Sequence, residues 1–231
     1  MKIFSEVGSD SMSTVRCDKC PGYYCFAGSW TEDKCPENCP MLLYKEVFER
    51  AVDMANDEKV SAINIPAAMV EKEGFAKVDG KNAPVYPRLR EIIEFAKKTG
   101  KTHIGLAFCK SSSSEAAIIG KILDSFGMTV DSILCKCGGI DKTLVGIPKE
   151  KKIRPPDTFE SCCNPLVQAE ILNDLGTDIN ILVGLCVGHD MLITKYSDAL
   201  VTTLIVKDKV TGNNPQAALY NIFAKRAYFT P

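Results

Sequence analysis

The sequence carries almost no net charge, very few histidines and no long apolar run. Its 28 lysines and arginines nearly balance 29 aspartates and glutamates, which gives a formal net charge of −1. Such a balance argues against a nucleic-acid-binding protein and against a polybasic membrane protein, because both need an excess of positive charge. No apolar stretch approaches the roughly 18 residues that cross a bilayer, and residues 1–16 lack the apolar core of a secretory signal. We therefore expect a cytoplasmic protein without a membrane or nucleic-acid partner.

Cysteine is the residue in excess. The chain of 231 residues has 11 cysteines but only 2 histidines. Without a secretory signal the thiols meet a reducing compartment, where cysteine-rich chains bind metal more often than they form disulfides. An odd number of cysteines also fits a disulfide framework poorly. The composition therefore predicts thiolate chemistry.

The first group of thiols is compact and lies in a segment without a helix or strand pattern. Prolines and glycines interrupt this segment, so we expect loops and turns with too few apolar residues to hold them together. The initial C-x2-C spacing suits zinc or an iron–sulfur cluster, but no second knuckle follows as in a zinc ribbon. Five thiols are available for four places, so Cys35 and Cys39 compete for the last one. The candidate ligands are Cys17, Cys20, Cys25 and Cys39, with Cys35 as the alternative.

Helix and strand patterns follow one another along the rest of the chain. Apolar residues with helical spacing lie in residues 43–54, 88–99, 112–126 and 165–175. Short apolar runs that predict buried strands occupy residues 102–108, 129–134, 179–185 and 201–206. Buried strands separated by helices predict an α/β fold, a parallel sheet with helices on both faces of the Rossmann-like or flavodoxin-like three-layer type. Residues 78–87 are expected to form a linker rich in Gly, Pro and Asn.

Three parts are expected along the chain. A cysteine-rich, metal-binding cap covers residues 1–40, and a helical segment that packs on the core covers residues 41–100. The α/β domain with a second four-cysteine site covers residues 101–231.

The second group of thiols follows the predicted strands. Cys109, Cys135 and Cys186 each come directly after one of the first three strands. Because the carboxyl ends of parallel strands meet at one edge of a sheet, we expect these thiols to lie at the same edge, where ligands bind. Cys163 precedes the helix that begins at Pro165. We expect the loop that carries it to fold over this edge and to supply a fourth thiol.

Four converging thiolates suit zinc or a [4Fe–4S] cluster. The second group contains no closely spaced knuckle, which favours the cluster, because a cluster accepts ligands contributed singly from distant segments. Cys137 and Cys162 are alternative ligands. His189 lies just after Cys186 and is a candidate proton donor or further ligand; its alternative role is to cap the next helix.

Four sequence runs resemble those of a family of uncharacterised cysteine-rich proteins, a domain of unknown function usually labelled metal-binding. The runs are CDKC followed by Cys25, then SCCNP, VGLCVGHDMLITKYS and VTTLIVKDKVTG. The resemblance implies two ligand sets, Cys17, Cys20, Cys25 and Cys39 at the front and Cys109, Cys135, Cys163 and Cys186 in the body. Cys35, Cys137 and Cys162 lie outside the family pattern. The resemblance implies no reaction.

These observations lead to an expected function with two alternatives. We expect a cytoplasmic protein with two iron–sulfur clusters of the [4Fe–4S] type that transfers electrons or supports a partner enzyme. The first alternative is a cluster-dependent enzyme with an open iron that acts on a small substrate. The second is a structural or sensing zinc protein. The expected partner is a redox protein or a small molecule, and an oligomer is compatible with the sequence.

Overall fold

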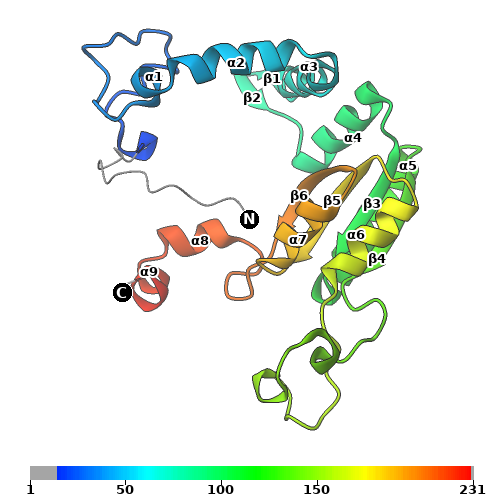
Figure 1. Ribbon diagram of the computed structural model, residues 1–231. Helices are drawn as coiled ribbons and strands as arrows, with labels where there is room; N and C mark the ends of the chain where they lie inside the picture. Colours follow the sequence, from blue (N-terminus) through cyan, green and yellow to red (C-terminus); the bar gives the residue numbers. More distant parts are fainter. Residues whose placement is uncertain (1–14, 230–231) are drawn as a thin grey trace, which may run out of the picture. The chain divides into compact units, whose positions relative to one another are not determined.

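A computed structural model describes residues 15–229 (Figure 1). The chain divides into two compact units, Met1–Ile65 and Pro66–Pro231, which are described separately. The start of the expected cap, and most of the segment in which we looked for a secretory signal, lie outside the described residues. Within residues 15–229, none of the helices is long and apolar enough to cross a bilayer.

The first unit consists of turns followed by helices. Cys39 is the N-cap of α1, and Pro40 occupies its first position, where the missing N–H of proline is not needed. No described residue of this unit, from 15 to 65, is buried. Residues 15–65 therefore form no apolar core of their own. The elements of the unit are η1 (Cys17–Lys19), α1 (Pro40–Leu43), α2 (Lys45–Asn56) and the first half of α3 (Glu58–Glu73).

The second unit is built on a parallel sheet of four strands in the order β4-β3-β5-β6. The strands are β3 (His103–Phe108), β4 (Thr129–Leu134), β5 (Ile179–Leu185) and β6 (Leu200–Val206). The helices around them are α4 (Arg88–Thr99), η2 (Lys110–Ser112), α5 (Ser113–Ser125), α6 (Pro165–Asp174) and α7 (His189–Tyr196). Between β4 and α6 the chain forms two short turns, η3 (Lys142–Val145) and η4 (Lys149–Lys151).

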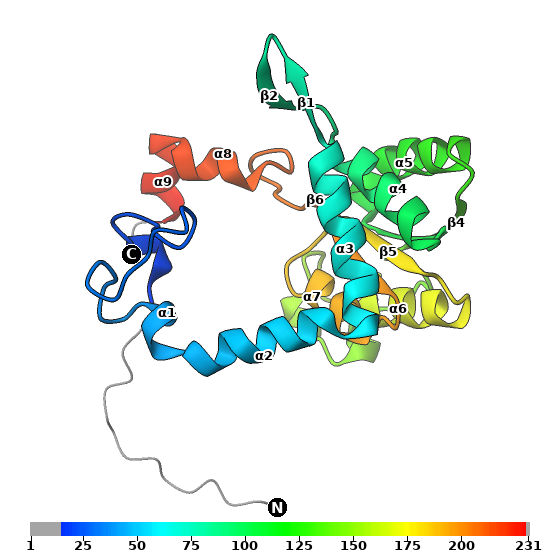
Figure 2. The ribbon, with the colours of Figure 1, turned by 90° about the horizontal axis from the view of Figure 1, so that it is seen from above.

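Both faces of the sheet are covered, as expected for the α/β fold. One face packs Ile104, Leu106 and Ile181 against apolar residues of α4 and α5. The alternate residues of the same strands point the other way, where Ala107 and Leu182 pack against α6 and α7. Figure 2 shows these two helix pairs on opposite sides of the sheet. The predicted parallel sheet with helices on both faces is confirmed.

The strand order places a topological switch point between β3 and β5. From β3 the chain continues to β4 on one side and then returns to β5 on the other. Phe108, the last residue of β3, pairs with Leu134 of β4 and with Val183 of β5. Crevices for ligands form at the carboxyl ends of the strands beside such a point. Cys109 and Cys186 follow the two strands that flank it.

Two elements differ from the sequence expectation. Residues 75–84 form an antiparallel hairpin of β1 (Phe75–Val78) and β2 (Lys81–Pro84), where a linker was expected from residue 78. Asp79 and Gly80 both have positive φ, 50° and 78°, which is the conformation of a two-residue hairpin turn. The chain also continues beyond the last strand as α8 (Pro215–Tyr220) and α9 (Ile222–Tyr228), for which no prediction was made.

Gly105 in β3 is required by close packing, and replacing it with alanine should destabilise the α/β domain. A Cβ at this position would overlap the side-chain oxygen of Asn180 and lie 2.9 Å from Leu172 Cδ2. Overpacking of this kind costs about 1–3 kcal/mol. We expect urea denaturation followed by circular dichroism to show this loss.

Gly120 provides the matched control for Gly105. It lies within α5, and the nearest atom to a Cβ there is Leu106 Cδ1 at 4.0 Å. The Gly120→Ala variant should be as stable as the parent or more stable by up to about 1 kcal/mol. Equal stability of the Gly105→Ala variant and the parent would contradict the packing described.

Candidate metal centres

Four of the five cap cysteines surround one hollow. Cys17, Cys20, Cys25 and Cys39 line a cavity of about 330 Å³ together with apolar side chains that include Met41 and Phe48. The C-x2-C pair is wound as a single turn, because Cys17 begins η1 and the amide of Cys20 donates to the carbonyl of Cys17. The amide of Tyr23 donates to Cys20 Sγ at 3.3 Å. These four residues, called the cap thiols below, are the four expected from the sequence.

Cys35 lies beside the cap thiols but does not line their hollow. Partial burial raises the pKa of the Cys35 thiol, and its hydrogen bond with Cys39 and the proximity of Cys20 and Cys25 raise it further. Cys35 therefore favours the protonated form, in which it can donate a hydrogen bond to a neighbouring thiolate. In the competition between Cys35 and Cys39, the cavity lining favours Cys39 as the fourth ligand.

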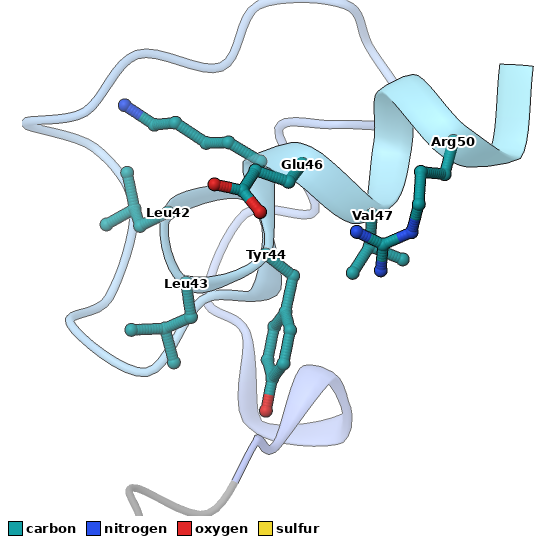
Figure 3. A pocket seen from close by; sticks show the side chains of 7 residues that line it. Leu42, Leu43, Tyr44, Glu46, Val47 and Arg50 are labelled. Carbon is teal, nitrogen blue, oxygen red and sulfur yellow. The ribbon is translucent and has the colours of Figure 1, made fainter.

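A second hollow in the first unit contains no thiol. It has a volume of about 360 Å³ and lies where α1 meets α2. Tyr44, Val47 and Arg50 point to the same side of the chain at this place (Figure 3). Its lining of leucines, valine and tyrosine with flanking charges offers no soft donor atoms, so it is not a candidate for a thiolate-bound metal.

The second group of thiols gathers at the carboxyl edge of the sheet. Cys109 follows β3 and donates its amide to the carbonyl of Val183 in β5, at 3.0 Å. Cys135 follows β4 and donates its amide to the carbonyl of Phe108 at the end of β3, at 2.9 Å. Cys109, Cys135, Cys163 and Cys186 are called the body thiols below.

Cys163 reaches this edge from a distant part of the chain. Its thiol is hydrogen-bonded to the thiol of Cys135, which is only 2% exposed. The hydrogen bond and burial raise the pKa of Cys135, whereas the same hydrogen bond and the nearby Lys136 and His189 lower the pKa of Cys163. In this pair, the surroundings therefore favour negative charge on Cys163 more than on the buried Cys135. Cys109 is close enough for its charge to act on Cys135 as well.

The body thiols lie in positive surroundings. Burial opposes the ionisation of Cys109, but the Ser111 hydroxyl and amide and the Lys207 ammonium outweigh it and lower the Cys109 pKa. Lys207, which also bonds to the Ser111 hydroxyl, comes directly after β6. The amide of Lys110 donates to Cys135 Sγ at 3.4 Å. Helices α5, α6 and α7 all begin at this edge, and the positive ends of helices stabilise thiolates.

A glycine allows the loop that carries Cys109 to pack on β5. Gly184 lies at an irregularity of the β5–β6 pairing and has φ of 62°. A Cβ there would overlap the hydroxyl of Ser112, which is completely buried. The β3 and β5 ends are thus held in direct contact at the switch point.

The remaining cysteines of the second unit are less closely connected. Cys186 is half-buried, and its carbonyl accepts the amides of His189 at 3.0 Å and Asp190 at 3.2 Å. Cys162 is 2% exposed, and its amide donates to the carbonyl of Ile140. Cys137 is half-buried, one residue beyond Lys136. The structure thus brings Cys109, Cys135, Cys163 and His189 within interaction range, and places Cys186 at the same edge without a described contact to their side chains.

The donor set suits a soft metal, although no closed metal site is formed. Among residues 15–229, no group of three or more His, Cys, Asp or Glu side chains stands at the distances of bound ligands. All 11 cysteines are free thiols. Thiolates select zinc and iron–sulfur clusters over hard cations such as magnesium. Both thiol groups fit such a metal in donor type and in number.

Two lysines around the body thiols, Lys207 and Lys136, were not singled out from the sequence, whereas Ser111 was considered as part of a helix N-terminus. Lys207 directly follows the last predicted strand, so the strand-end argument that found the cysteines would also have found it. Ser111 follows Cys109 by two residues and donates its hydroxyl to Cys109 Sγ at 3.4 Å. Lys136 follows Cys135 and donates to the carbonyl of Ser161 at 2.6 Å. No sequence motif marks these lysines, because any lysine at the end of a strand can place its charge beside the thiols.

The segment between Cys135 and Cys163 should loosen in acid. The Lys152 ammonium, followed by the amides of Thr143 and Glu160, holds the pKa of Asp141 well below its usual range. A carboxylate whose pKa is lowered by folding contributes its full stabilisation above its ordinary pKa of about 4, and loses it as the pH falls below that value.

Hydrogen exchange of the metal-free protein measures this effect. Protection of the Thr143 and Glu160 amides should decrease between pH 5 and pH 2. The Cys109 amide, which bonds to Val183 in the sheet, should keep its protection. Undiminished protection of Thr143 and Glu160 at pH 2 would contradict the role of Asp141.

Comparison with known proteins places the chain in a family without assigning it a reaction. An uncharacterised protein of Methanocaldococcus jannaschii is 38% identical over 206 residues, which cover 89% of this chain and 94% of that protein. No solved structure matches the chain. The family model described as a protein of unknown function (DUF1847) matches residues 39–204, which include all four body thiols and Cys39. The chain belongs to the DUF1847 family of proteins of unknown function.

Proposed function

We propose that this protein binds metal at two thiol sites and acts as a cytoplasmic redox protein. The cap thiols form one site and the body thiols the other, and each site holds a [4Fe–4S] cluster. The observation that carries the proposal is the meeting of Cys109, Cys135 and Cys163 at one edge of the sheet. They come from three separate segments, the ends of β3 and β4 and the residue pair before α6.

A cluster is favoured over zinc at the body site by the way the ligands are supplied. Structural zinc sites draw their cysteines from closely spaced knuckles, whereas here each thiol comes singly from its own loop. The cap site has one knuckle, Cys17 and Cys20, so a zinc ion there with a cluster in the body is the second candidate. Free thiols at all 11 positions support a reducing, cytoplasmic location.

When bound, a cluster takes up and releases one electron at a potential set by the charge and hydrogen bonds around its sulfur atoms. The chain supplies such groups at both sites. The amides of Tyr23 and Lys110 donate to Cys20 and Cys135, and the Ser111 hydroxyl donates to Cys109. Lys207 stabilises negative charge on Cys109, and Lys136 stabilises negative charge on Cys163. These donors and cations favour the reduced state.

A potentiometric titration tests the redox function. Protein purified without oxygen should be reduced by dithionite in one-electron steps, with loss of visible absorption and the appearance of an electron paramagnetic resonance signal. The Lys207→Met variant should be reduced at a more negative potential than the parent, because the cation beside Cys109 is lost. A protein with no reducible chromophore would contradict the proposal.

A further inference from the structure

The segment between Cys135 and Cys163 forms a lobe whose two ends are joined to each other. We call residues 136–162 the lobe; it is the green-to-yellow loop that extends from the sheet in Figure 1. Near its base the Cys162 amide donates to the Ile140 carbonyl at 2.8 Å, and the Lys142 amide donates to the Glu160 carbonyl at 3.0 Å. Asp141 and Ser161 form an antiparallel bridge between these bonds. The two ends of the lobe therefore run side by side.

This pairing determines where Cys163 lies. Cys163 directly follows the paired end of the lobe, and the next residue, Asn164, donates its amide to the Cys135 carbonyl at 2.8 Å. Lys136, at the other end, donates its ammonium to the Ser161 carbonyl at 2.6 Å. Cys135 and Cys163 are far apart in sequence, and they meet where the paired end of the lobe continues into α6, whose N-cap is Asn164.

Two largely buried ion pairs connect the lobe, Lys142 with Glu160 at 2.7 Å and Asp141 with Lys152, and the second of them also joins the middle of the lobe to its ends. Lys152 Nζ lies 2.8 Å from Asp141 Oδ1, and its side chain is only 5% exposed. The same carboxylate accepts the amides of Thr143 at 2.9 Å and Glu160 at 2.8 Å, and Lys152 also donates to the Thr158 carbonyl at 3.1 Å. The pair thus joins the first end of the lobe, its middle and its second end. Removing one partner would leave a charge in a largely buried place without its counter-ion.

A third ion pair in the lobe has the same chemistry as the Asp141–Lys152 pair but a different position. Lys149 Nζ lies 2.9 Å from Asp157 Oδ1, but the two side chains are 62% and 87% exposed. Exposed pairs of this kind contribute little to stability. Lys149 is therefore a matched control for Lys152, since both are lysines paired with aspartates in the same lobe.

We infer that the Asp141–Lys152 pair is a positioning device for Cys163, and that the body metal leaves the protein by opening of the lobe. The inference rests on the proposed metal at the body thiols. With the pair intact, the lobe ends stay together and the Cys163 thiol stays beside Cys135. Without it, the ends separate, and the body site loses the one thiol that does not follow a strand.

Metal release from the intact protein tests the inference. Protein purified without oxygen is mixed with an excess of a chromogenic iron or zinc chelator, and release is followed for the parent and for the Lys152→Met, Lys152→Arg and Lys149→Met variants. Loss of groups that support metal ligands typically costs about 10- to 100-fold in affinity. We expect Lys152→Met to release the body metal at least about tenfold faster, Lys152→Arg to restore a slow rate, and Lys149→Met to match the parent. The rate at which the cap metal is released should be the same in all four proteins.

A measurement on metal-free protein separates this inference from the proposed function. A short bifunctional alkylating reagent, followed by peptide mapping, should join Cys135 to Cys163 in the parent and in Lys149→Met. The yield should fall in Lys152→Met, while the urea midpoint of the α/β domain is unchanged. A parent protein without body metal would contradict the proposed function, whereas equal cross-linking in Lys152→Met and Lys149→Met would overturn the positioning role. Equal release rates in these two variants would overturn it as well.

Discussion

We expect replacement of Cys109 with serine to remove the whole metal content of the proposed body site, and replacement of Cys163 with serine to remove the same metal. If the site holds a [4Fe–4S] cluster, each variant loses about four iron and four sulfide per chain relative to the parent. The reason is that both thiols belong to one site in the proposed function, although they are distant in sequence. Cys109 follows β3 and acts on Cys135 through its charge, while Cys163 is hydrogen-bonded to the same Cys135. A serine hydroxyl is a hard donor and does not replace a soft thiolate.

The double variant and a control distinguish one shared site from two separate ones. A protein with both substitutions should lose no more metal than either single variant, because effects at one shared site do not add. Cys137→Ser is the control, since Cys137 lies in the lobe outside the four body thiols. If the two single losses differ and add in the double variant, Cys109 and Cys163 do not serve the same metal.

Removing the metal from the cap should unfold the cap and leave the α/β domain folded. No described residue from 15 to 65 is buried, so burial of apolar surface contributes little to the stability of this unit. In such units the free energy of metal binding is the free energy of folding. The α/β domain differs, because Ile93, Ile104 and Leu182 are among its fully buried side chains. It therefore has a core that requires no metal.

Trp30 reports on this transition, since it is the single tryptophan of the chain and lies in the cap. We expect its fluorescence to shift to longer wavelength on chelation, and limited proteolysis to cut within residues 15–56 first. Among single variants, Cys39→Ser should show the same behaviour without chelator, whereas Cys35→Ser should resemble the parent, because Cys35 does not line the thiol cavity. A cap that keeps its Trp30 spectrum and its protease resistance after complete removal of metal would disprove this account.

The sequence predicts the α/β fold and the edge where the body thiols gather because both depend on local patterns. Continuous apolar runs identify the four strands, and helices between them require parallel crossovers. Since Cys109, Cys135 and Cys186 directly follow strands, their common edge follows from the topology alone. The cap thiols are close together in sequence, so their common cavity also follows from spacing.

The closure of the lobe and the position of Lys207 depend on contacts between distant residues, which no local sequence pattern predicts. The pairing of the lobe ends joins Ile140 to Cys162 and Asp141 to Lys152, and neither pair has a characteristic spacing. Lys207 reaches Cys109 only because β6 lies beside β5 in the sheet. The hairpin at 75–84 is a different case, because the Asp79-Gly80 pair is a recognised signal for a two-residue turn. Its strands are short and exposed, which leaves them without the apolar run used to find the others.

The most direct test of two thiol-bound metal sites is the content of iron, zinc and acid-labile sulfide per chain in protein purified without oxygen. The account predicts about eight iron and eight sulfide, or about four iron and four sulfide with one zinc if the cap holds zinc. Protein that contains neither iron nor zinc, with all 11 cysteines still reactive toward a thiol reagent, would contradict it.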